Sequence, residues 1–320
     1  MPIPGCLARI LPIREEAMQS MSDEVMKRVL VAGATGYLGK FAVQAFKERG
    51  YQVRVLTRSE QRLSEAGPFT APALSKNDVD EIFVGEISKP GTLSGLMDGI
   101  DLVFSSVGIS RQRDGLTFEQ VDYQCNQNLI DSCQSSGVTR FVYVSMQGAE
   151  NIMQLAITQA HEKVVAALKD SGMEYRIVRP CGYFSDMGAV LDMAKKGRAY
   201  LIGDGSNKMN PIHGRDLARV CVDAAEGDEL EVEAGGPDIM TQRQAVELAF
   251  EVVGKPEKVT IIPMWLARGI VKFIGLLSTQ FGDLADFIVT AGEIDGVGPK
   301  RGRTSLRSYF EALHAGDPHP

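Results

Sequence analysis

A glycine-rich turn near the start of the chain places the tightest limit on its fold. Residues 29–46 read VLVAGATGYLGKFAVQAF, an apolar run followed by three glycines and an amphipathic helical pattern. A glycine at a strand end permits a tight turn, the next lets a phosphate approach the backbone, and the third lets helix and strand pack closely. The start of the helix then offers free N–H groups and a partial positive charge to an anion. This context predicts a dinucleotide site formed by Gly33, Thr35, Gly36, Tyr37, Leu38 and Gly39, the alternative being a glycine-rich turn in another kind of α/β protein.

The second strand bears on which dinucleotide would bind. An NAD site usually carries an acidic residue about 20 residues after the glycines, where it meets the ribose hydroxyls. The corresponding stretch here is Val53–Arg58, and it contains no carboxylate. Arg58 can instead pair with a 2′-phosphate. We therefore expect NADP(H) to be preferred over NAD(H), while a solvated loop arginine is the alternative role for Arg58.

From Lys27 the pattern alternates between strands and helices. Buried strands separated by helices are typical of a parallel sheet covered on both faces. The fold class expected is therefore α/β, a Rossmann-type doubly wound parallel sheet. The expected strands are Arg28–Ala32, Gln52–Thr57, Glu81–Gly85, Asp101–Val107, Arg140–Ser145 and Tyr175–Val178. The expected helices between them are Leu38–Arg49, Thr92–Met97, Phe118–Ser135 and Thr158–Asp170.

Three regions follow from this pattern. Residues 1–26 are expected to form a flexible N-terminal extension, and 27–180 the dinucleotide-binding domain, with Ser59–Asp80 as a surface excursion. After Pro180, glycine and proline breaks become frequent. Residues 181–320 are therefore expected to form a smaller, mixed substrate-binding lobe with parts returning to the sheet. Its expected helices are Gly214–Ala225, Thr241–Val253, Met264–Leu277 and Thr304–Leu313.

Charge and cysteine content exclude some functions and favour a compartment. A net charge of −7 and a pI near 5.3 argue against a nucleic-acid surface, which needs a basic face. The five cysteines are scattered and form no metal-like cluster with the four histidines, so no metal is expected. Reduced thiols indicate the cytoplasm, or an organellar stroma if the first 25 residues act as a presequence.

One apolar stretch raises the question of membranes. No apolar run reaches the ~18 residues that a spanning helix needs. Trp265–Leu277 comes nearest, but Arg268 and Lys272 interrupt it. The spacing of apolar residues over Met264–Leu277 is that of an amphipathic helix. Such a helix usually packs on a core. In this position it could also border an apolar substrate cleft or make peripheral contact with a membrane surface.

Several motifs in order resemble a known superfamily. The segments VLVAGATGYLGK, FVYVSMQGAE, SGMEYRIVRPCGYFSDM and PIHGRDLA resemble the atypical short-chain dehydrogenases/reductases, in their NmrA-like branch. Within that branch, VDYQCNQNLID, VRPCGYFSDM and the stretch from residue 234 to residue 277 are similar to divinyl chlorophyllide 8-vinyl reductases. The resemblance runs from about Lys27 to LRSYFEAL. Those reductases have RPTAFF where this chain has RPCGYF, and a segment before their final helix is missing here.

The resemblance implies further cofactor contacts. Residues at the ends of the fourth, fifth and sixth strands are placed by it beside the nicotinamide and its ribose. They are Ser105, Ser106, Val107, Gly108, Ser145, Met146, Pro180, Cys181 and Gly182. Glu86 takes a place near the adenine where the family often has Asp.

The usual catalytic pair of this superfamily is absent. Standard members use Tyr-x-x-x-Lys, in which the lysine lowers the pKa of the tyrosine that moves the proton. No tyrosine of this chain has a lysine four residues later. The resemblance puts His161 where the atypical branch often has a lysine, either as a ribose contact or a proton donor, the alternative being a surface histidine. Lys163 lies about 200° away on a helix and cannot face the same side. Ser145 and Tyr183 are further candidates for catalysis, although Tyr183 could also be a packing aromatic.

Three functions remain in competition. The first is an NADPH-dependent reductase of a small hydrophobic substrate with a carbonyl, enone or vinyl-type group. The second is a non-catalytic NADP(H)-binding sensor or an assembly factor for membrane complexes, which the missing tyrosine–lysine pair favours. The third, a sugar-nucleotide epimerase, is the least favoured because it depends on the absent tyrosine. The loop RPCGYFSDM, which keeps the motif of the resembled family, and an apolar cleft favour the reductase.

Overall fold

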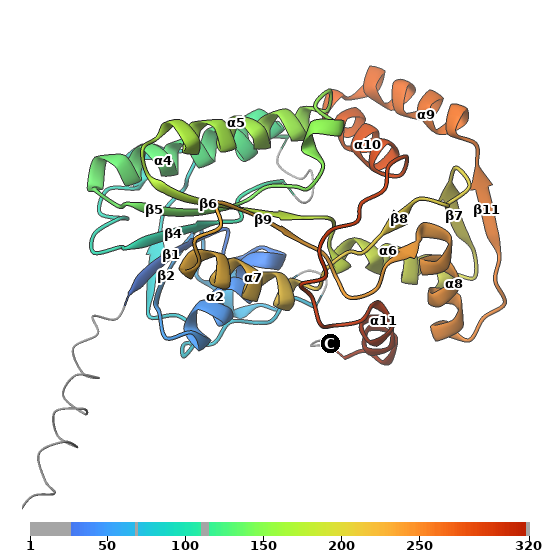
Figure 1. Ribbon diagram of the computed structural model, residues 1–320, viewed down its shortest axis with the longest axis horizontal. Coiled ribbons are helices and arrows are strands. Elements are labelled where there is room, and N and C mark those ends of the chain that lie inside the picture. The colour runs from blue at the N-terminus through green and yellow to red at the C-terminus, as the bar shows by residue number, and fades with distance from the viewer. Residues whose placement is uncertain (1–26, 68–69, 110–114, 318–320) are drawn as a thin grey trace, which may run out of the picture.

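A seven-stranded parallel sheet forms the centre of the molecule (Figure 1). The computed structural model describes residues 27–67, 70–109 and 115–317. The strands lie in the order β3-β2-β1-β4-β5-β6-β9, and every neighbouring pair is parallel. They span β1 Arg28–Ala32, β2 Gln52–Thr57, β3 Glu81–Val84, β4 Leu102–Ser105, β5 Arg140–Val144, β6 Glu174–Pro180 and β9 Glu231–Ala234. This doubly wound order confirms the predicted α/β, Rossmann-type fold.

Helices cover both faces of the sheet, so the central strands bury apolar side chains on both faces. The helices α2 (Tyr37–Glu48) and α7 (Gly214–Glu226) lie on one face, and α4 (Cys125–Ser136) and α5 (Ala156–Asp170) lie on the other (Figure 1). A short π-helical turn, Glu119–Gln124, leads directly into α4. In β1, Val29 and Val31 join the core beneath α2 and α7, whereas Leu30 and Ala32 join the core beneath α4 and α5. Alternate side chains of one strand therefore bind the two helical layers to the sheet.

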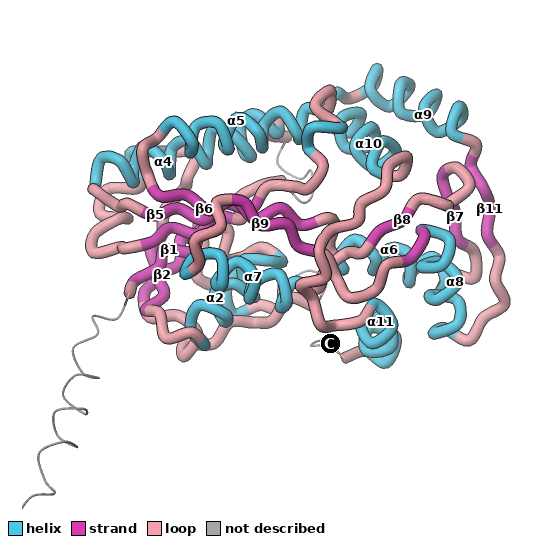
Figure 2. The backbone as a smooth tube through the Cα atoms, viewed as in Figure 1, coloured by secondary structure: helices cyan, strands magenta, loops and turns pink. Residues whose placement is uncertain are grey.

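The C-terminal part of the chain forms a second, smaller core beside the carboxyl ends of the strands (Figure 2). Three helices share it: α6 (Phe184–Lys195), α8 (Gln242–Val253) and α11 (Leu306–Ala315). Two short sheets accompany them, in which β7 (Ala199–Ile202) pairs with β11 (Val259–Ile262) and β8 (Lys208–Met209) pairs with β10 (Met240–Thr241). Between these pieces the chain returns to the central sheet as α7 and β9. The division into two domains at Pro180 stays a prediction.

A helical pair stands at the edge of this smaller core. The helices α9 (Met264–Leu277) and α10 (Thr279–Ala291) are joined by the single residue Ser278 and pack against each other (Figure 1). Their backbones approach closely at Gly275 and Gly282, where a Cβ on Gly282 would lie 2.6 Å from the Cα atom of Gly275. The predicted boundaries of α9 are confirmed.

Three local predictions were wrong, and glycine explains two of them. The helix expected over Thr92–Met97 is a 3-10 turn, Pro90–Thr92, followed by further turns, because Gly95 adopts a left-handed φ of 79°. The helices α6 and α10 were not expected, since each contains an internal glycine that lowers its intrinsic helix propensity. The segment Ser59–Asp80 is not only a surface excursion. It contains the short helix α3 (Gln61–Ser64) and sends three buried side chains into the core: Leu63, Ala71 and Leu74.

Candidate nucleotide-binding site

The glycine turn after β1 has the geometry that a close backbone approach requires. Gly33 has a φ of 87°, in the left-handed region that favours glycine. A Cβ at Gly33 would lie 2.8 Å from Ser106 Oγ, and a Cβ at Gly39 would lie 2.0 Å from the carbonyl oxygen of Gly33. The amide of Gly36 donates to that same carbonyl at 2.9 Å and closes the turn. Gly33 therefore fits the tight turn, and Gly39 fits the close packing of helix on strand.

The start of α2 is open to an anionic ligand. Gly36 is the N-cap residue, so no side chain caps the helix, and the first turn contains no acidic residue. Nearby, the hydroxyl of Ser106 is buried and has no hydrogen-bond partner among the described residues. A helix N-terminus and an unpartnered hydroxyl beside a glycine turn suit a phosphate or a sugar oxygen. The residues present fit a dinucleotide in this position. Thr35 lies in the same turn, and Leu38 is the second residue of α2.

The loop after β4 is fixed from below by two polar side chains. Asn126, which is fully buried, accepts from the hydroxyl of Ser105 at 2.5 Å and donates to the carbonyl oxygen of Val107 at 3.1 Å. Asp122 accepts from the amide of Ile109 at 3.1 Å. A Cβ at Gly108 would lie 2.7 Å from the Asp122 carboxylate. The backbone from Ser105 to Ile109 is therefore held against the π-helical turn and α4, with Gly108 exposed above Asp122.

His161 is bound at both ring nitrogens. Its Nδ1 lies 2.9 Å from the hydroxyl of Tyr143 in β5, and its Nε2 lies 3.2 Å from the carboxylate of Asp122. With Nε2–H donating to the carboxylate, Nδ1 accepts from the tyrosine. The same Nε2 is 4.0 Å from the position of a Cβ on Gly108. His161 thus faces the loop after β4 from α5, and its role toward a cofactor stays a prediction.

Lys163 points elsewhere, as the helical geometry predicts. Its amine donates to both carboxylate oxygens of Glu119, at 2.7 and 2.8 Å, and lies 5.3 Å from the centre of the Tyr123 ring. Its side chain is half exposed. Lys163 therefore takes no place beside Gly108.

Ser145 and Met146 sit at the edge of a charged network. The Ser145 hydroxyl is buried, donates to Glu162 at 3.1 Å and accepts from Arg179 at 3.3 Å. Arg179 also donates to the carbonyl oxygen of Met146 and pairs with Glu162 and Glu231. The structure thus engages Ser145 with Arg179 of β6 and with Glu162, the residue that follows His161 on α5.

The turn after β6 carries an aromatic residue toward the glycine turn. Gly182 has a φ of 145°, and its carbonyl oxygen accepts from the amide of Ile212. Tyr183 follows, and its ring meets that of Tyr37 edge-on at 6.4 Å between centroids. Burial raises the pKa of both tyrosines well above the usual value. Both phenols therefore stay protonated at neutral pH, and the Tyr37 oxygen accepts from the amide of Gly214.

A neutral buried histidine supports this aromatic group from α7. His213 is the N-cap of that helix and accepts from the amide of Arg215 through Nδ1 at 3.2 Å. Its other nitrogen has no hydrogen-bond partner among the described residues, and the rings of Phe41, Phe184 and Tyr309 surround it. Burial lowers the pKa of His213 to about 4. The histidine is therefore an uncharged packing and capping residue.

Arg58 and Lys40 differ in their burial. Arg58 is exposed on the loop after β2, whereas Lys40 is fully buried in α2. The amine of Lys40 donates to the carbonyl oxygens of Leu63 and Glu65, both at 2.7 Å. Lys40 thereby fastens the segment that follows Arg58 to the nucleotide-binding helix. Glu86 pairs with Lys89 instead, and this pairing lowers the pKa of its carboxyl.

Lys40, Asp122 and Tyr143 are site residues that sequence reasoning missed. The position of Lys40 directly after Gly39, and of Asp122 within VDYQCNQNLID, were the available signals. No signal in the sequence points to Tyr143, because its contact with His161 depends on how β5 packs on α5.

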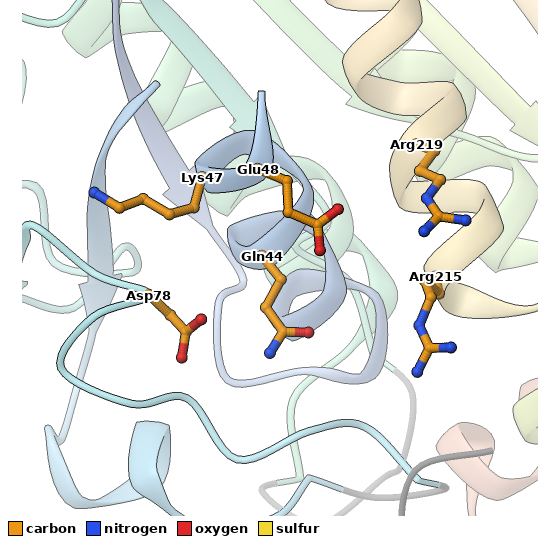
Figure 3. A pocket seen from close by; sticks show the side chains of 6 residues that line it. All are labelled: Gln44, Lys47, Glu48, Asp78, Arg215 and Arg219. Atoms are coloured by element: carbon orange, nitrogen blue, oxygen red, sulfur yellow. The ribbon is translucent and has the colours of Figure 1, made fainter. Parts of the chain in front are cut away.

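Two surface hollows lie outside the glycine turn. One, of about 500 Å³, lies between α2 and α7, where Arg215 and Arg219 extend beside Gln44 and Glu48 (Figure 3). The other, of about 520 Å³, is bordered by Arg179, Glu162 and the two glutamates of β9. Neither contains a residue of the glycine turn. Among the described residues there is no His/Cys/Asp/Glu group suited to a metal ion, and none of their helices is long and apolar enough to cross a membrane.

Comparison with known proteins agrees with this geometry. Residues 33–228, more than half of the chain, match the model of a family described as NAD(P)H-binding. The chain belongs to this NAD(P)H-binding family. The matched region starts at Gly33 and includes the loop after β4, His161 and the turn after β6. The predicted binding of a nicotinamide dinucleotide is thereby confirmed at the level of NAD(P)H.

Two kinds of curated relative are similar to this NAD(P)H-binding chain. The chloroplastic divinyl chlorophyllide a 8-vinyl-reductase of Cucumis sativus is 27% identical over 298 residues, covering 86% of this chain and 70% of that protein. The photosystem II assembly factor Ycf39 of Trieres chinensis is 24% identical over 253 residues, covering 77% of this chain and 76% of that protein. The resemblance to the vinyl reductases is therefore confirmed. The assignment to the NmrA-like branch stays a prediction.

Solved structures share the fold. The NADPH-dependent quinone oxidoreductase QOR2 of Escherichia coli, complexed with NADPH, aligns with a TM-score of 0.69 and 20% identity, covering 89% of this chain and 99% of that one. The UDP-glucose 4-epimerase of Thermus thermophilus, in complex with NAD, aligns with a TM-score of 0.61 and 18% identity, covering 88% of this chain and 98% of that one. These likenesses extend over both cores of the molecule.

Proposed function

We propose that this NAD(P)H-binding protein is an NADPH-dependent reductase of a small hydrophobic substrate that carries a carbonyl, enone or vinyl-type group. The observation that supports this most is the juxtaposition of the open glycine turn, the unpartnered Ser106 hydroxyl and the Asp122–His161 pair. Relatives named as vinyl reductases and a structural neighbour named as a quinone oxidoreductase act on such substrates.

The preference for NADP(H) over NAD(H) belongs to this proposal. Arg58 is exposed at the end of β2, and a guanidinium pairs well with a 2′-phosphate. Lys40 supports that pairing indirectly, because it fastens the segment after Arg58 through two hydrogen bonds. No acidic residue lies between Val53 and Arg58 to hold a free 2′-hydroxyl.

The residues of the chain would bind the dinucleotide, orient the substrate and supply a proton. When bound, the nicotinamide supplies a hydride to a carbon atom of the substrate. The glycine turn and the first residues of α2 would hold the diphosphate, and Ser106 would meet the ribose or the phosphate. His161 would contact the nicotinamide ribose or, when both of its ring nitrogens carry a proton, give up the proton at Nε2 and keep the one at Nδ1, with Asp122 and Tyr143 fixing its ring. Ser145 and Tyr183 remain proposed as hydrogen-bond donors near the substrate, and Met146, Pro180 and Gly182 as cofactor contacts.

The deciding experiment is an assay of NADPH oxidation against quinones, enones and porphyrin precursors. We expect turnover of at least one hydrophobic class. The matched variants His161→Ala and Lys163→Ala lie on the same helix, but only His161 faces the loop after β4. Loss of turnover in the first and not the second supports the proposed site. Tight NADPH binding with no turnover on any compound would contradict the reductase.

A second candidate is a non-catalytic NADP(H)-binding sensor or assembly factor. The missing Tyr-x-x-x-Lys pair favours it, as does the relative named as a photosystem II assembly factor. Nucleotide-dependent association with a membrane complex, without NADPH consumption, would support this role. The epimerase stays the least favoured function, although epimerases share the fold. The compartment proposed is the cytoplasm, or an organellar stroma as for the relatives named as chloroplastic.

A further inference from the structure

The helix α9 presents large apolar side chains to solvent. Trp265 is 75% exposed, Phe273 63%, Leu276 85% and Leu277 74%. Leu266 and Ile270 are also exposed. These six residues are called the outer face of α9. Figure 1 shows α9 at the periphery, beyond α10 and above β11.

The outer face is continuous around the helix. With 3.6 residues per turn, its six side chains and Gly269 fall within an arc of about 140° that contains no polar residue. The buried residue Ala267 lies on the opposite side. Arg268 turns toward α10, where it pairs with Asp286 and Glu293. The packed side of the helix thus already has its partners, while the large side chains of the apolar arc stay 40% to 85% exposed.

The apolar area is larger than folding alone explains. Six large side chains exposed to this extent present on the order of 700 Å² of apolar surface, whereas the largest patch of a typical monomer is roughly 300–600 Å². Two exposed side chains of α10, Phe281 and Ile288, add to the apolar surface of the helical pair. An interface with another folded protein also includes several hydrogen-bonding groups, whereas the indole N–H of Trp265 is the one side-chain hydrogen-bonding group of the arc.

We propose that the outer face of α9 docks on the surface of a lipid bilayer. The residues from Met264 to Leu277 include no Asp or Glu and two cations, although the whole chain has a net charge of −7. Lys272 is exposed at the edge of the apolar arc, so it meets the headgroup layer when the arc enters the acyl boundary. Trp, Phe and Leu are the side chains that such interfacial helices use. Because Arg268 is already paired with Asp286 and Glu293, Lys272 is the cation of this helix that would meet an anionic headgroup.

Docking by α9 would bring the membrane near the loop after β4. Gln280, in the first turn of α10, donates to the carbonyl oxygen of Gly115, seven residues after Gly108. A hydrophobic substrate dissolved in the bilayer would then approach from the side of the molecule where α10 meets that loop. This consequence rests on the proposed function, whereas the docking itself requires no turnover.

Trp265 allows a direct test, because it is the only tryptophan of the chain. The full-length protein is mixed with phosphatidylcholine vesicles with and without phosphatidylglycerol. We expect Trp265 emission to shift to the blue, brominated acyl chains to quench it, and the protein to float with the vesicles, more so when phosphatidylglycerol is present. Phe273→Glu should weaken flotation at least tenfold. Ile261→Glu, at a residue 53% exposed on β11, is the matched control and should leave flotation unchanged.

Two results would overturn the proposal. The first is wild-type Trp265 emission that vesicles of either composition leave unchanged. The second is a blue shift that appears without lipid, grows with protein concentration and disappears in Phe273→Glu, because the face then binds a second copy of the chain. NADPH binding and the thermal transition of each variant show that it is folded. Loss of turnover with flotation intact would contradict the reductase and leave the docking supported.

Discussion

His213 is expected to make the stability of the fold depend on pH between about 4 and 6.5. The side chain is fully buried at the start of α7, and burial lowers its pKa from 6.5 to about 4. In the unfolded chain the same histidine takes up its proton near pH 6.5. Between these values the unfolded state binds more protons than the folded state, so acidification favours unfolding. The stability present above pH 6.5 is lost progressively as the pH falls toward 4.

The magnitude follows from the size of the pKa shift. Each pKa unit corresponds to about 1.4 kcal/mol, so the free energy of unfolding falls by about 3 kcal/mol over the whole window and by about 2 kcal/mol between pH 7 and pH 5. The test is urea unfolding of the wild type and of His213→Asn at both pH values. Asparagine is a good N-cap residue and does not titrate in this range. Carboxylates and the other histidines contribute equally to the pH dependence of unfolding in both proteins.

We expect the wild type to lose about 2 kcal/mol more than His213→Asn between pH 7 and pH 5. The absolute stability of the variant is lower because the ring packs against Phe41, Phe184 and Tyr309. That loss is the same at both pH values and does not enter the comparison. Equal pH dependence in the two proteins would refute the reasoning, since it would mean that His213 takes up its proton in the folded state as readily as in the unfolded chain.

Three further predictions concern the nucleotide site. Gly39→Ala should lower NADPH affinity at least tenfold, because its Cβ would meet the carbonyl oxygen of Gly33 at 2.0 Å; Gly91→Ala, which has open space, should change nothing in the same calorimetric titration. Arg58→Glu should weaken NADPH at least tenfold and NADH far less, and an equal loss for both nucleotides would contradict the 2′-phosphate contact. His161→Ala should lower kcat/KM at least tenfold in the NADPH oxidation assay, with wild-type values in Lys163→Ala; equal effects would show that His161 has no special role.

The sequence predicts most of the central sheet because its signals are local. The bounds of β1 and β2 follow from short apolar runs that end at a glycine or at a polar loop. The glycine turn was recognisable for the same reason, since its three glycines follow one another closely between strand and helix, although the close contact of Gly33 with Ser106 is not local. The bounds of α9 were also local, because its apolar residues repeat with the helical period.

Other features depend on contacts that no local pattern reveals. The partners of His161 lie 18 and 39 residues away, on β5 and on the turn before α4. Lys40 reaches a segment more than 20 residues later. In α10, packing against α9 at Gly282 outweighs the low helix propensity of glycine. The spacing of α9 left open whether its apolar side packs on a core, borders a cleft or contacts a membrane surface, and its exposure follows only from how α9 packs on α10.

The most direct measurement of the central claim is isothermal titration of NADPH and NADH into the folded wild-type protein. The account predicts saturable binding of one dinucleotide per chain, tighter for NADPH, because the uncapped start of α2 and the glycine turn hold the diphosphate. A folded protein that binds neither nucleotide would contradict it.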